Sequence, residues 1–485
     1  MSGGGIKINI LRTFAGLAVA FFAATYGLAQ TTQDSTGHIP AVRTQITPPS
    51  QASTWWKRAG EQHLLDFSEN KSKVVVDPIV QVMVGIVQFN TPERKDLTIW
   101  DNIRGARFQA ELDEKFYIGG ELLERQGVAE PLLGLWAVQN RIPGWGRSKL
   151  GRDNSWNTVE QAYYDVSRSR GWTGWSNGIW SADAGIDAMH FGAGRASALI
   201  SKTAVPAPYA RVGLKRKNHR TEVSISQWMS DQRGPLGATA ESLLKRSHVS
   251  TLRHAWEIKP HWTVQGAYQF IREKSVSSAP AGWETLGMSE NDEYRAMRHS
   301  LAAESQLHFR FLSTGRAVIF VQQSFDIGGN NRRSIGSNDS FRKIHALTSL
   351  AGMRLETKCF ELIVEAYRQS DVACATCYEY EALAPETSGP QIAVFNHAGM
   401  PTQGTWNESV RIEGSAKIRN RGRLSAIAEQ SSAATSVQIQ STYLIQHTWP
   451  LRLQCSIGRV NPLGNLETGY HWYSIGLCAA VSDWK

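Results

Sequence analysis

Cysteine is scarce in this chain, and long apolar runs are scarcer still. Among 485 residues there are 5 cysteines, too few for a fold held together by disulfides. After the first thirty residues no run of about 18 apolar residues occurs, which excludes a helical membrane protein. A membrane protein built from strands stays allowed, because alternating apolar and polar residues average out in hydropathy.

Charge of one sign is not gathered in any one block either. The net charge of +9 is spread along the sequence, and no nucleic-acid-binding motif accompanies it. We therefore expect no nucleic-acid partner. A basic outer surface would instead attract lipopolysaccharide or an anionic polysaccharide.

The first 29 residues have the features of a secretory signal peptide. Lys7 and Arg12 supply positive charge, residues 17–24 form an apolar core, and Gly27-Leu28-Ala29 is a small-x-small cleavage site. Residues 30–72 are expected to form a periplasmic lead-in. Within it, residues 53–70 are predicted to form a short amphipathic helix that plugs or flanks the lower mouth of the following domain.

From residue 73 to 485, runs of about ten residues alternate apolar and polar side chains. Residues 262–270 show the pattern, with Trp262, Val264, Gly266, Tyr268 and Phe270 on one face and polar residues on the other. Residues 300–311 and 359–368 repeat it. Such runs predict strands that have one apolar and one polar face.

The connections between these runs alternate in length, and this alternation indicates in which cellular compartment the protein lies. Every second connection is short and the others are mostly long and polar, as in outer-membrane barrels with short periplasmic turns. Counting predicts an all-β fold: a closed antiparallel transmembrane β-barrel of about 18 strands in the outer membrane, with outer-membrane lipid as a partner. One pair of strands is expected at 156–168 and 178–188.

Charged residues within the runs are expected to face the lumen, because a charge facing lipid near mid-depth costs roughly 2–4 kcal/mol. The residues expected to point inward are Arg107, Glu111, Glu124, Arg125, Glu413, Lys417 and Arg423.

Tryptophan is abundant, with 17 residues. Several lie near expected strand ends and predict an interfacial girdle: Trp100, Trp156, Trp180, Trp262, Trp449 and Trp472. Trp136 and Trp145 lie in the first long loop, where they either pack within the loop or stack on sugars, with Arg147 or Lys149 pairing an acidic sugar.

The sequence shows no catalytic or metal-binding constellation. There is no HExxH motif, and a single CxxC (Cys374 to Cys377) lacks the second pair of a zinc site. We expect no enzymatic activity and no cofactor. Cys374 and Cys377 form either a local disulfide or an incidental pair, and Cys455 and Cys478 are expected to face each other across a hairpin, where they can form a second disulfide.

The glycines at 192 and 194 resemble a shortened phosphate-binding loop, but a third glycine and a βαβ unit are missing. Glycines beside a strand end more often allow a tight turn or the close approach of a backbone.

The segment 190–209 resembles a motif of the Wzi family of capsule-assembly proteins, in its Bacteroidota-type branch. The matching residues are His190-Phe191-Gly192-Ala193-Gly194-Arg195, then Ser197 to Ser201, then Ala204 and Pro206-Ala207-Pro208-Tyr209. Residues 104–108, 115–117, 124–126 and 160–164 are similar to earlier strands of that family. The chain departs from the pattern at Ile186-Asp187, where relatives carry Gly-Arg, and at its end, where Lys485 follows Trp484.

The resemblance implies an 18-stranded barrel that retains capsular polysaccharide or exopolysaccharide at the cell surface. Residues Trp136, Trp145, Arg147, Lys149, His190 and Arg195 are then candidates for polysaccharide contact. The family-motif residues are Phe191, Gly192, Gly194, Ser197, Ser201, Pro206, Pro208 and Tyr209. Two alternatives stay open: a porin for oligosaccharides or other solutes, and an accessory of gliding or secretion machinery that binds other envelope proteins.

Overall fold

The computed structural model describes the chain in segments. These are residues 65–69, 71–128, 131, 147–150, 163–187, 189–194, 197–199, 206–233, 244–273, 296–311, 315–328, 344–371, 407–418, 421–431, 434–445, 451–462 and 469–479. The predicted signal peptide, residues 30–64 of the lead-in and Cys374 and Cys377 lie outside them. Within these segments, no helix is long and apolar enough to cross a membrane.

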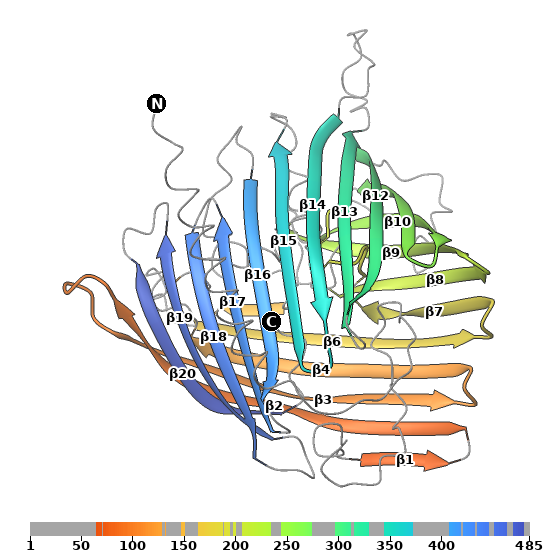
Figure 1. The fold of residues 1–485 in the computed structure, drawn as a ribbon. Coiled ribbons are helices and arrows are strands. Elements are labelled where there is room, and N and C mark those ends of the chain that lie inside the picture. Colours follow the sequence, from red (N-terminus) through yellow and green to blue (C-terminus); the bar gives the residue numbers. More distant parts are fainter. Residues whose placement is uncertain are drawn as a thin grey trace, which may run out of the picture. The chain divides into compact units, whose positions relative to one another are not determined.

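The described chain is built from twenty strands (Figure 1). They are β1 (Leu65–Glu69), β2 (Ser72–Phe89), β3 (Leu97–Leu112), β4 (Phe116–Val128), β5 (Arg147–Leu150), β6 (Tyr163–Ser176), β7 (Trp180–Asp187), β8 (Ala207–Arg216), β9 (His219–Arg233), β10 (Leu244–Lys259), β11 (Trp262–Glu273), β12 (Ala296–Phe311), β13 (Gly315–Gly328), β14 (Ile344–Glu356), β15 (Phe360–Asp371), β16 (Asn407–Ile418), β17 (Gly422–Ser431), β18 (Ala434–Leu444), β19 (Arg452–Pro462) and β20 (Tyr470–Ala479).

Eighteen of these strands, all except β1 and β5, form a closed antiparallel barrel. Each pairs with the next along the chain, and β20 pairs with β2 from Val80↔Ala479 to Phe89↔Tyr470, which closes the ring. Closure removes the sheet edges, so the backbone polar groups of the wall are paired within lipid. The predicted fold class and strand number are confirmed.

The two ends of the barrel differ in the length of their connections. At one end most turns have two or three residues, at 113–115, 177–179, 217–218, 260–261, 312–314, 357–359 and 419–421. At the other end most connections are longer, at 129–162, 188–206, 234–243, 274–295, 329–343 and 372–406, with shorter ones at 90–96, 432–433 and 463–469. We call the first the periplasmic end and the second the outer end, following the topology of outer-membrane barrels.

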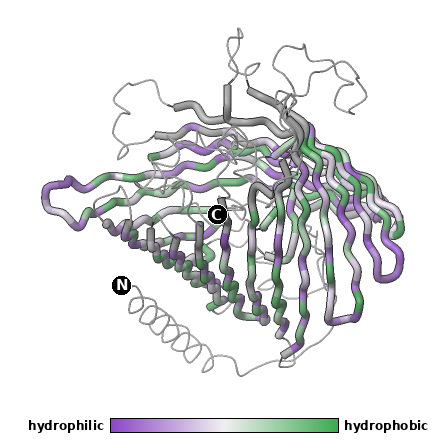
Figure 2. The backbone as a smooth tube through the Cα atoms, turned by 90° about the horizontal axis from the view of Figure 1, so that it is seen from above, coloured by the Kyte–Doolittle hydropathy of each residue, from purple (hydrophilic) through white to green (hydrophobic). Residues whose placement is uncertain are grey.

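Many polar side chains are buried and many large apolar ones are exposed, unlike in a soluble protein. On β11, Gln265 is 3 % exposed while Tyr268 is 37 % exposed, as the alternation predicts. Buried Glu304, Gln322 and Ser324 contrast with exposed Leu301, Val321 and Ile319 on the same hairpin. Figure 2 shows the two kinds of residue alternating along the strands. The outer face therefore suits lipid and the inner face suits water.

The predicted helix over 53–70 is wrong at its C-terminal end. Residues 65–69 form β1, which pairs with residues 72–76 of β2. The pairing of β20 with β2 begins only at Val80, so β1 covers the edge that β20 leaves open near the periplasmic end. A free edge with unpaired backbone groups draws this segment into the sheet. Residues 53–64 lie outside the described part.

The strand predicted at 156–168 is displaced in the structure. β6 spans Tyr163–Ser176, and the turn to β7 lies at 177–179. The glycine- and tryptophan-rich stretch 171–175 resembles a turn in composition, but it pairs with β4 and β7 as regular strand.

Most of the charges expected in the lumen are there. Arg107 contacts buried Glu121, Arg125 contacts Asp101, Glu413 contacts Arg411, and Arg423 donates to Ser415. Strand pairing places Glu111 and Lys417 on the same inner face.

Glu124 is the exception, and the expectation that it points inward is wrong. It lies on the outer face, opposite Arg104 in the β3–β4 pairing and two positions from exposed Leu122. The alternation of β4 requires this, because Glu121 and Leu123 occupy the inner face.

Of the predicted tryptophan girdle, Trp180 and Trp262 are exposed at the first positions of β7 and β11, next to periplasmic turns, as expected. Trp100 is on the outer face of β3, opposite Val84 and Val128. The expectation that Trp472 belongs to the girdle is wrong, since its side chain faces inward and packs with Val87 and Tyr470. Trp156 and Trp449 lie outside the described residues.

The disulfide predicted between Cys455 and Cys478 is wrong. Cys455 lies opposite Ile475 and Cys478 lies opposite Arg452, so the two cysteines are three positions out of register. An odd offset places them on opposite faces of the wall. Cys455 is exposed, and the Sγ of buried Cys478 lies 3.4 Å from Gln454 Oε1.

Adjacent residues of β18 test the assignment of faces. Ile439→Arg places a charge on the exposed outer face and is expected to lower the free energy of unfolding by about 2–4 kcal/mol. Gln438→Arg adds the same group to the half-buried inner face, where water is available, and is expected to cost much less. Urea unfolding in lipid vesicles, followed by tryptophan fluorescence, measures both. An equal loss in the two variants would contradict the assigned faces.

Candidate functional site

The segment between β7 and β8 comprises residues 188–206, and we call it the inner loop because its described residues lie inside the barrel. Its described residues are 189–194, 197–199 and 206. Phe191 and Leu199 pack in one buried cluster with Val249, Ala267, Ile271 and Ala302 of β10, β11 and β12. These wall residues lie on the inner face, opposite exposed residues such as Leu252 and Leu301. The inner loop therefore folds against the inside of the barrel.

A second apolar contact extends the inner loop to more distant strands. Ala198 packs with Phe320, Leu350 and Tyr367 of β13, β14 and β15, and Ala193 packs against the same cluster. The loop thus leaves the wall at β7 and contacts inner-face residues as far around the barrel as β15. The wall presents apolar residues on its inner face where the loop packs, and burying them stabilises the docked loop.

Polar side chains of the wall bind the backbone of the loop. Glu304 accepts hydrogen bonds from Ala193 N, at 3.0 Å to Oε1, and also contacts Gln322. Gln322 Oε1 accepts from Ala198 N at 2.9 Å, and Ser324 Oγ donates to Ala198 O at 2.5 Å. These bonds satisfy main-chain groups that would otherwise be buried without partners, at a cost of about 1–3 kcal/mol each.

Gly192 lies directly against the side chains of the wall. Its φ of +103° lies in a region that L side chains rarely adopt, and an added Cβ would collide with Gln322 and Glu304. The sequence-based interpretation of this glycine as a position of close backbone approach is therefore confirmed.

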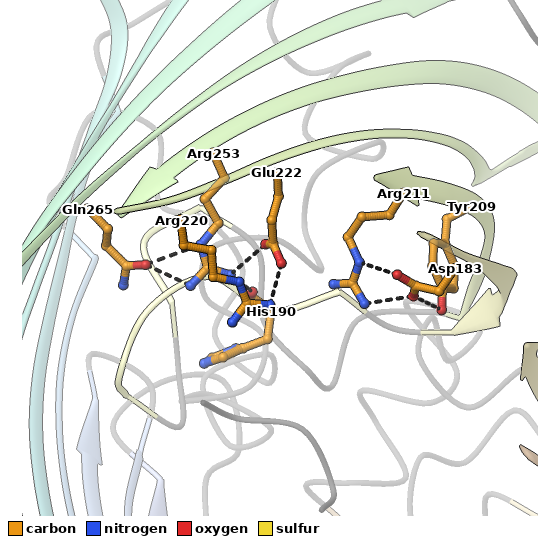
Figure 3. A network of polar contacts seen from close by, with 8 residues as sticks. All are labelled: Asp183, His190, Tyr209, Arg211, Arg220, Glu222, Arg253 and Gln265. Atoms are coloured by element: carbon orange, nitrogen blue, oxygen red, sulfur yellow. Dashed lines mark hydrogen bonds and ion pairs between the residues drawn. The ribbon is translucent and has the colours of Figure 1, made fainter. Parts of the chain in front are cut away.

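A row of arginines lines the inner wall beside the loop (Figure 3). Arg211 of β8 makes a two-point contact with Asp183 of β7, at 3.0 Å and 2.7 Å, and Tyr209 OH donates to the same carboxylate at 2.9 Å. Arg220 Nη2 lies 2.5 Å from Glu222 Oε1, and Arg253 Nη1 lies 3.7 Å from Glu222 Oε2.

Arg253 connects the arginine row to the inner loop. Its guanidinium donates to Gln265 Oε1 at 2.6 Å and to the carbonyl of His190 at 3.3 Å, and it stacks over the Phe191 ring at 5.4 Å. One side chain thus holds both the wall and the first residues of the loop. A planar guanidinium with five donors suits this combination of contacts.

The guanidinium groups, and not the carboxylates, are presented to the lumen. Side chains of Arg211, Arg220 and Arg253 are 27 %, 38 % and 31 % exposed, whereas those of Asp183 and Glu222 are 3 % and 8 % exposed. Three cations against two anions leave this group one positive charge in excess. The side of the lumen formed by β7 to β10 is therefore positive where a solute would meet it.

The arginine row continues onto neighbouring strands. Glu121 of β4 is buried between Arg107 of β3 and Arg170 of β6, at 2.6 Å and 2.8 Å, and Arg170 also contacts Asp187 of β7 at 3.4 Å. Buried charges that are fully paired in this way cross-link adjacent strands.

Carboxylates gather around one arginine on the opposite side of the ring. Arg411 of β16 contacts Glu413 at 3.0 Å and Glu429 of β17 at 3.8 Å, and it stands directly between Glu365 and Glu429 in the strand pairing. Three acids share one guanidinium, while Lys417 and Arg423 lie on the same inner face nearer the periplasmic end. By strand order, β15 to β17 lie across the lumen from β7 to β9.

The residues expected to contact polysaccharide are not brought together in the described structure. Trp136, Trp145 and Arg195 lie outside the described residues, as does Ser201 of the motif. Arg147 and Lys149 belong to β5, whose backbone pairs with Ser167 and Asp165 of β6. His190 contributes its carbonyl to Arg253 within the lumen.

The remaining motif residues hold the inner loop in place. Phe191, Gly192, Gly194, Ser197 and Pro206 are buried, and Ser197 Oγ accepts a hydrogen bond from Leu199 N at 3.1 Å. Pro208 lies on the outer face of β8, opposite Ile186, and Tyr209 faces inward on Asp183. Most of these described residues do not form an outward ligand surface, because apolar and hydrogen-bonding partners on the inner wall hold them inside.

The functional residues that sequence reasoning missed are Asp183, Arg211, Arg220, Glu222, Arg253, Glu304 and Gln322. Alternation of apolar and polar residues was the available signal, since each occupies an inward position of its strand. What alternation does not show is which inward residues, from strands far apart in sequence, meet the inner loop.

No family model matches this chain, and no curated protein matches it. Solved structures with a similar strand arrangement include OccAB4 of Acinetobacter baumannii, at 9 % identity and a TM-score of 0.46 over 85 % of this chain and 98 % of that one. OpdK of Pseudomonas aeruginosa, described as an outer membrane protein, is similar at 6 % identity and a TM-score of 0.47 over 84 % and 98 %. OpdK solved with vanillate gives 6 % identity and 0.49 over the same shares. This degree of likeness carries no statement about what the present chain binds.

The anchors of the inner loop are testable by substitution. Glu304→Ala combined with Gln322→Ala removes the acceptors for Ala193 N and Ala198 N, and about 1–3 kcal/mol of local stability is expected to be lost per group. Hydrogen exchange at residues 191–199 should then accelerate while exchange in the strands stays slow.

Gln438→Ala, on the inner face of β18 away from the loop, is the matched control and should leave loop exchange unchanged. Unaltered exchange at 191–199 in the double variant would show that these two side chains do not hold the loop.

Proposed function

We propose that this protein is a non-enzymatic outer-membrane channel for small polar solutes, in which the inner loop sets the size of the passage. The observation that carries the proposal is the inner loop itself. It crosses from β7 to the inner faces of β10 to β15 and is bound there by Arg253, Glu304, Gln322 and Ser324. A segment that is held across a water-suited lumen narrows the path without closing the wall.

The charge distribution supports a preference among solutes. Exposed guanidinium groups of Arg211, Arg220 and Arg253 lie on one side, and the acids around Arg411 lie on the other. A solute that carries a carboxylate or phosphate would lower its energy next to the arginine row, since guanidinium groups bind such oxygens in a planar, two-point manner. We expect anions to be favoured over cations.

Retention of capsular polysaccharide is the second candidate function. It is supported by the resemblance of residues 190–209 to the Wzi family. Most of the described residues of that motif are buried in the lumen or its wall, so polysaccharide would have to be bound by other loops of the outer end. A role in gliding or secretion with other envelope proteins stays a prediction from the same resemblance. A channel is expected to conduct ions across a planar bilayer, whereas a polysaccharide-binding barrel with a closed lumen is not.

Conductance in planar bilayers tests the channel. The wild-type protein is expected to give small, stable steps, and replacing residues 191–199 by a short glycine-serine linker should raise the step size severalfold by removing the constriction. The shift on sodium dodecyl sulfate gels between unheated and boiled samples verifies that the variant barrel is folded. Absence of steps in both proteins, with loss of capsule from a deletion strain, would contradict transport and favour polysaccharide retention.

The charge preference is tested separately by ion selectivity. Arg220→Glu reverses the most exposed charge of the row and is expected to move the zero-current potential in a salt gradient toward cation selectivity. Lys417→Glu, on the inner face of β16 across the lumen, makes the same change of charge away from the row. If both variants shift the potential equally, the row has no special part in selectivity.

A further inference from the structure

An ion pair projects from the outer face of the barrel. Arg104 Nη2 of β3 lies 2.8 Å from Glu124 Oε2 of β4, and the two side chains are 58 % and 49 % exposed. They share this face with exposed Phe108 and Leu122, so they point in the direction of lipid.

The pair lies within the apolar band of the wall. Val80 of β2 is directly opposite Arg104, and the outer face of β2 continues toward the outer end with exposed Val82, Val84 and Ile86. Trp100 of β3, also on the outer face, lies beyond Arg104 in the same direction. Charges that face lipid destabilise a barrel most near mid-depth. Because the neighbouring outer residues of β2 are apolar, a solvated position beyond the membrane does not account for this pair.

Polar residues surround the ion pair on three adjacent strands. Asn102 lies opposite Gln126 in the β3–β4 pairing, and Glu124 and Gln126 lie opposite Ser167 and Asp165 of β6. We call this surface the outer polar patch, and its residues are Asn102, Arg104, Glu124, Gln126, Asp165, Ser167 and Ser169. Elsewhere the outer face carries residues such as Leu252, Leu301, Val321 and Ile439.

Beside the outer polar patch, β6 is flanked by two short strands. β7 has 8 residues, fewer than the roughly 9–11 that a tilted strand needs to cross a bilayer. It pairs with β6 from Gly171 to Ser176, and β5, of 4 residues, pairs with Tyr164 to Ser167. Where the outer face is polar, covering by protein is more favourable than covering by lipid, because protein groups can pair with the polar side chains.

We propose that the outer polar patch and the adjoining face of β6 and β7 form the surface on which a second copy of this chain packs. Arg104 and Glu124 place one cation and one anion side by side, so this pair is complementary to itself under a two-fold rotation. Arg104 of each copy then faces Glu124 of the other, the self-complementary arrangement typical of symmetric dimers.

The chemistry of this face favours a protein occupant over a lipid headgroup. An anionic headgroup drawn to Arg104 would meet the carboxylate of Glu124 at 2.8 Å from the guanidinium. The outer positions of β6 and β7 are mostly small, with Ser167, Ser169, Gly171, Thr173, Ala182 and Ala184. Small and polar residues are typical of interfaces between transmembrane helices, since they allow close approach and mutual hydrogen bonding, and the same physical reason applies between two barrel walls. This proposal does not depend on the transport function.

Charge exchange tests the pairing between copies. The wild-type chain, reconstituted in lipid nanodiscs large enough for two barrels, is expected to be dimeric by native mass spectrometry. Each single variant, Arg104→Glu or Glu124→Arg, places like charges together across the interface. Each should raise the dissociation constant of the dimer at least about tenfold, which corresponds to roughly 1.4 kcal/mol of binding free energy. The double exchange Arg104→Glu/Glu124→Arg should restore the dimer, since it re-forms opposite pairs across the interface.

Cross-linking tests which face is in contact. In a background with the 5 native cysteines replaced by serine, Ser167→Cys on β6 is expected to form a disulfide-linked dimer on mild oxidation. Val321→Cys, equally on the outer face but on β13 across the barrel, should not. Arg104→Leu/Glu124→Leu gives a wall fully suited to lipid, and is expected to be a folded monomer even where the charge-exchange variants fail to fold.

A monomeric wild-type protein, or a dimer that the double leucine variant leaves unchanged, would overturn the proposal. So would cross-linking at Val321→Cys as strong as at Ser167→Cys. Binding of lipopolysaccharide to a monomer, lost in the leucine variant, would assign the patch to a lipid headgroup and would equally overturn a second copy as its occupant.

Discussion

An unpaired amide or carbonyl in the hydrocarbon of a membrane costs several kcal/mol, and the rest of this structure follows from avoiding that cost. Pairing of β20 with β2 closes the ring, and β1 covers the part of the β2 edge that β20 does not reach. Once the wall is closed, each strand has one face toward lipid and one toward the lumen. Side chains are then divided by simple alternation, which explains why glutamine and glutamate are buried while valine and leucine are exposed.

The inner loop lies in a polar lumen, and its own groups need partners there. The inner loop has main-chain groups that must be paired and apolar side chains that must be covered. The wall supplies both at the same place, with Glu304 and Gln322 for the amides and Phe320, Leu350 and Tyr367 for the apolar residues. Arg253 adds the contact between the arginine row and the loop, so the part that narrows the lumen and the part that gives it charge are built as one unit.

The inner and outer surfaces each have residues that depart from their general character. On the inner face, one set of apolar residues is covered by the inner loop. On the outer face, the polar residues around Arg104 and Glu124 lie within the apolar band, and this is the reason to assign them to contact with another copy. The first departure marks a contact within the chain, and we assign the second to a contact between copies.

The sequence by itself determined the architecture: a closed barrel of about 18 strands, its inward and outward residues, and short turns at one end. Alternation is local, so each strand reveals its own faces without reference to its neighbours. The errors lie where local composition misleads. Residues 65–69 have an amphipathic composition that fits a helix, yet an open edge of β2 recruits them as a strand. Cys455 and Cys478 flank a turn evenly, yet the register places them on opposite faces. Only the tertiary structure decided that residues 189–199 turn into the lumen and that Arg253, Glu304 and Gln322 hold them there. Those contacts join residues more than sixty positions apart, and their energy depends on distances across the lumen that no local pattern contains.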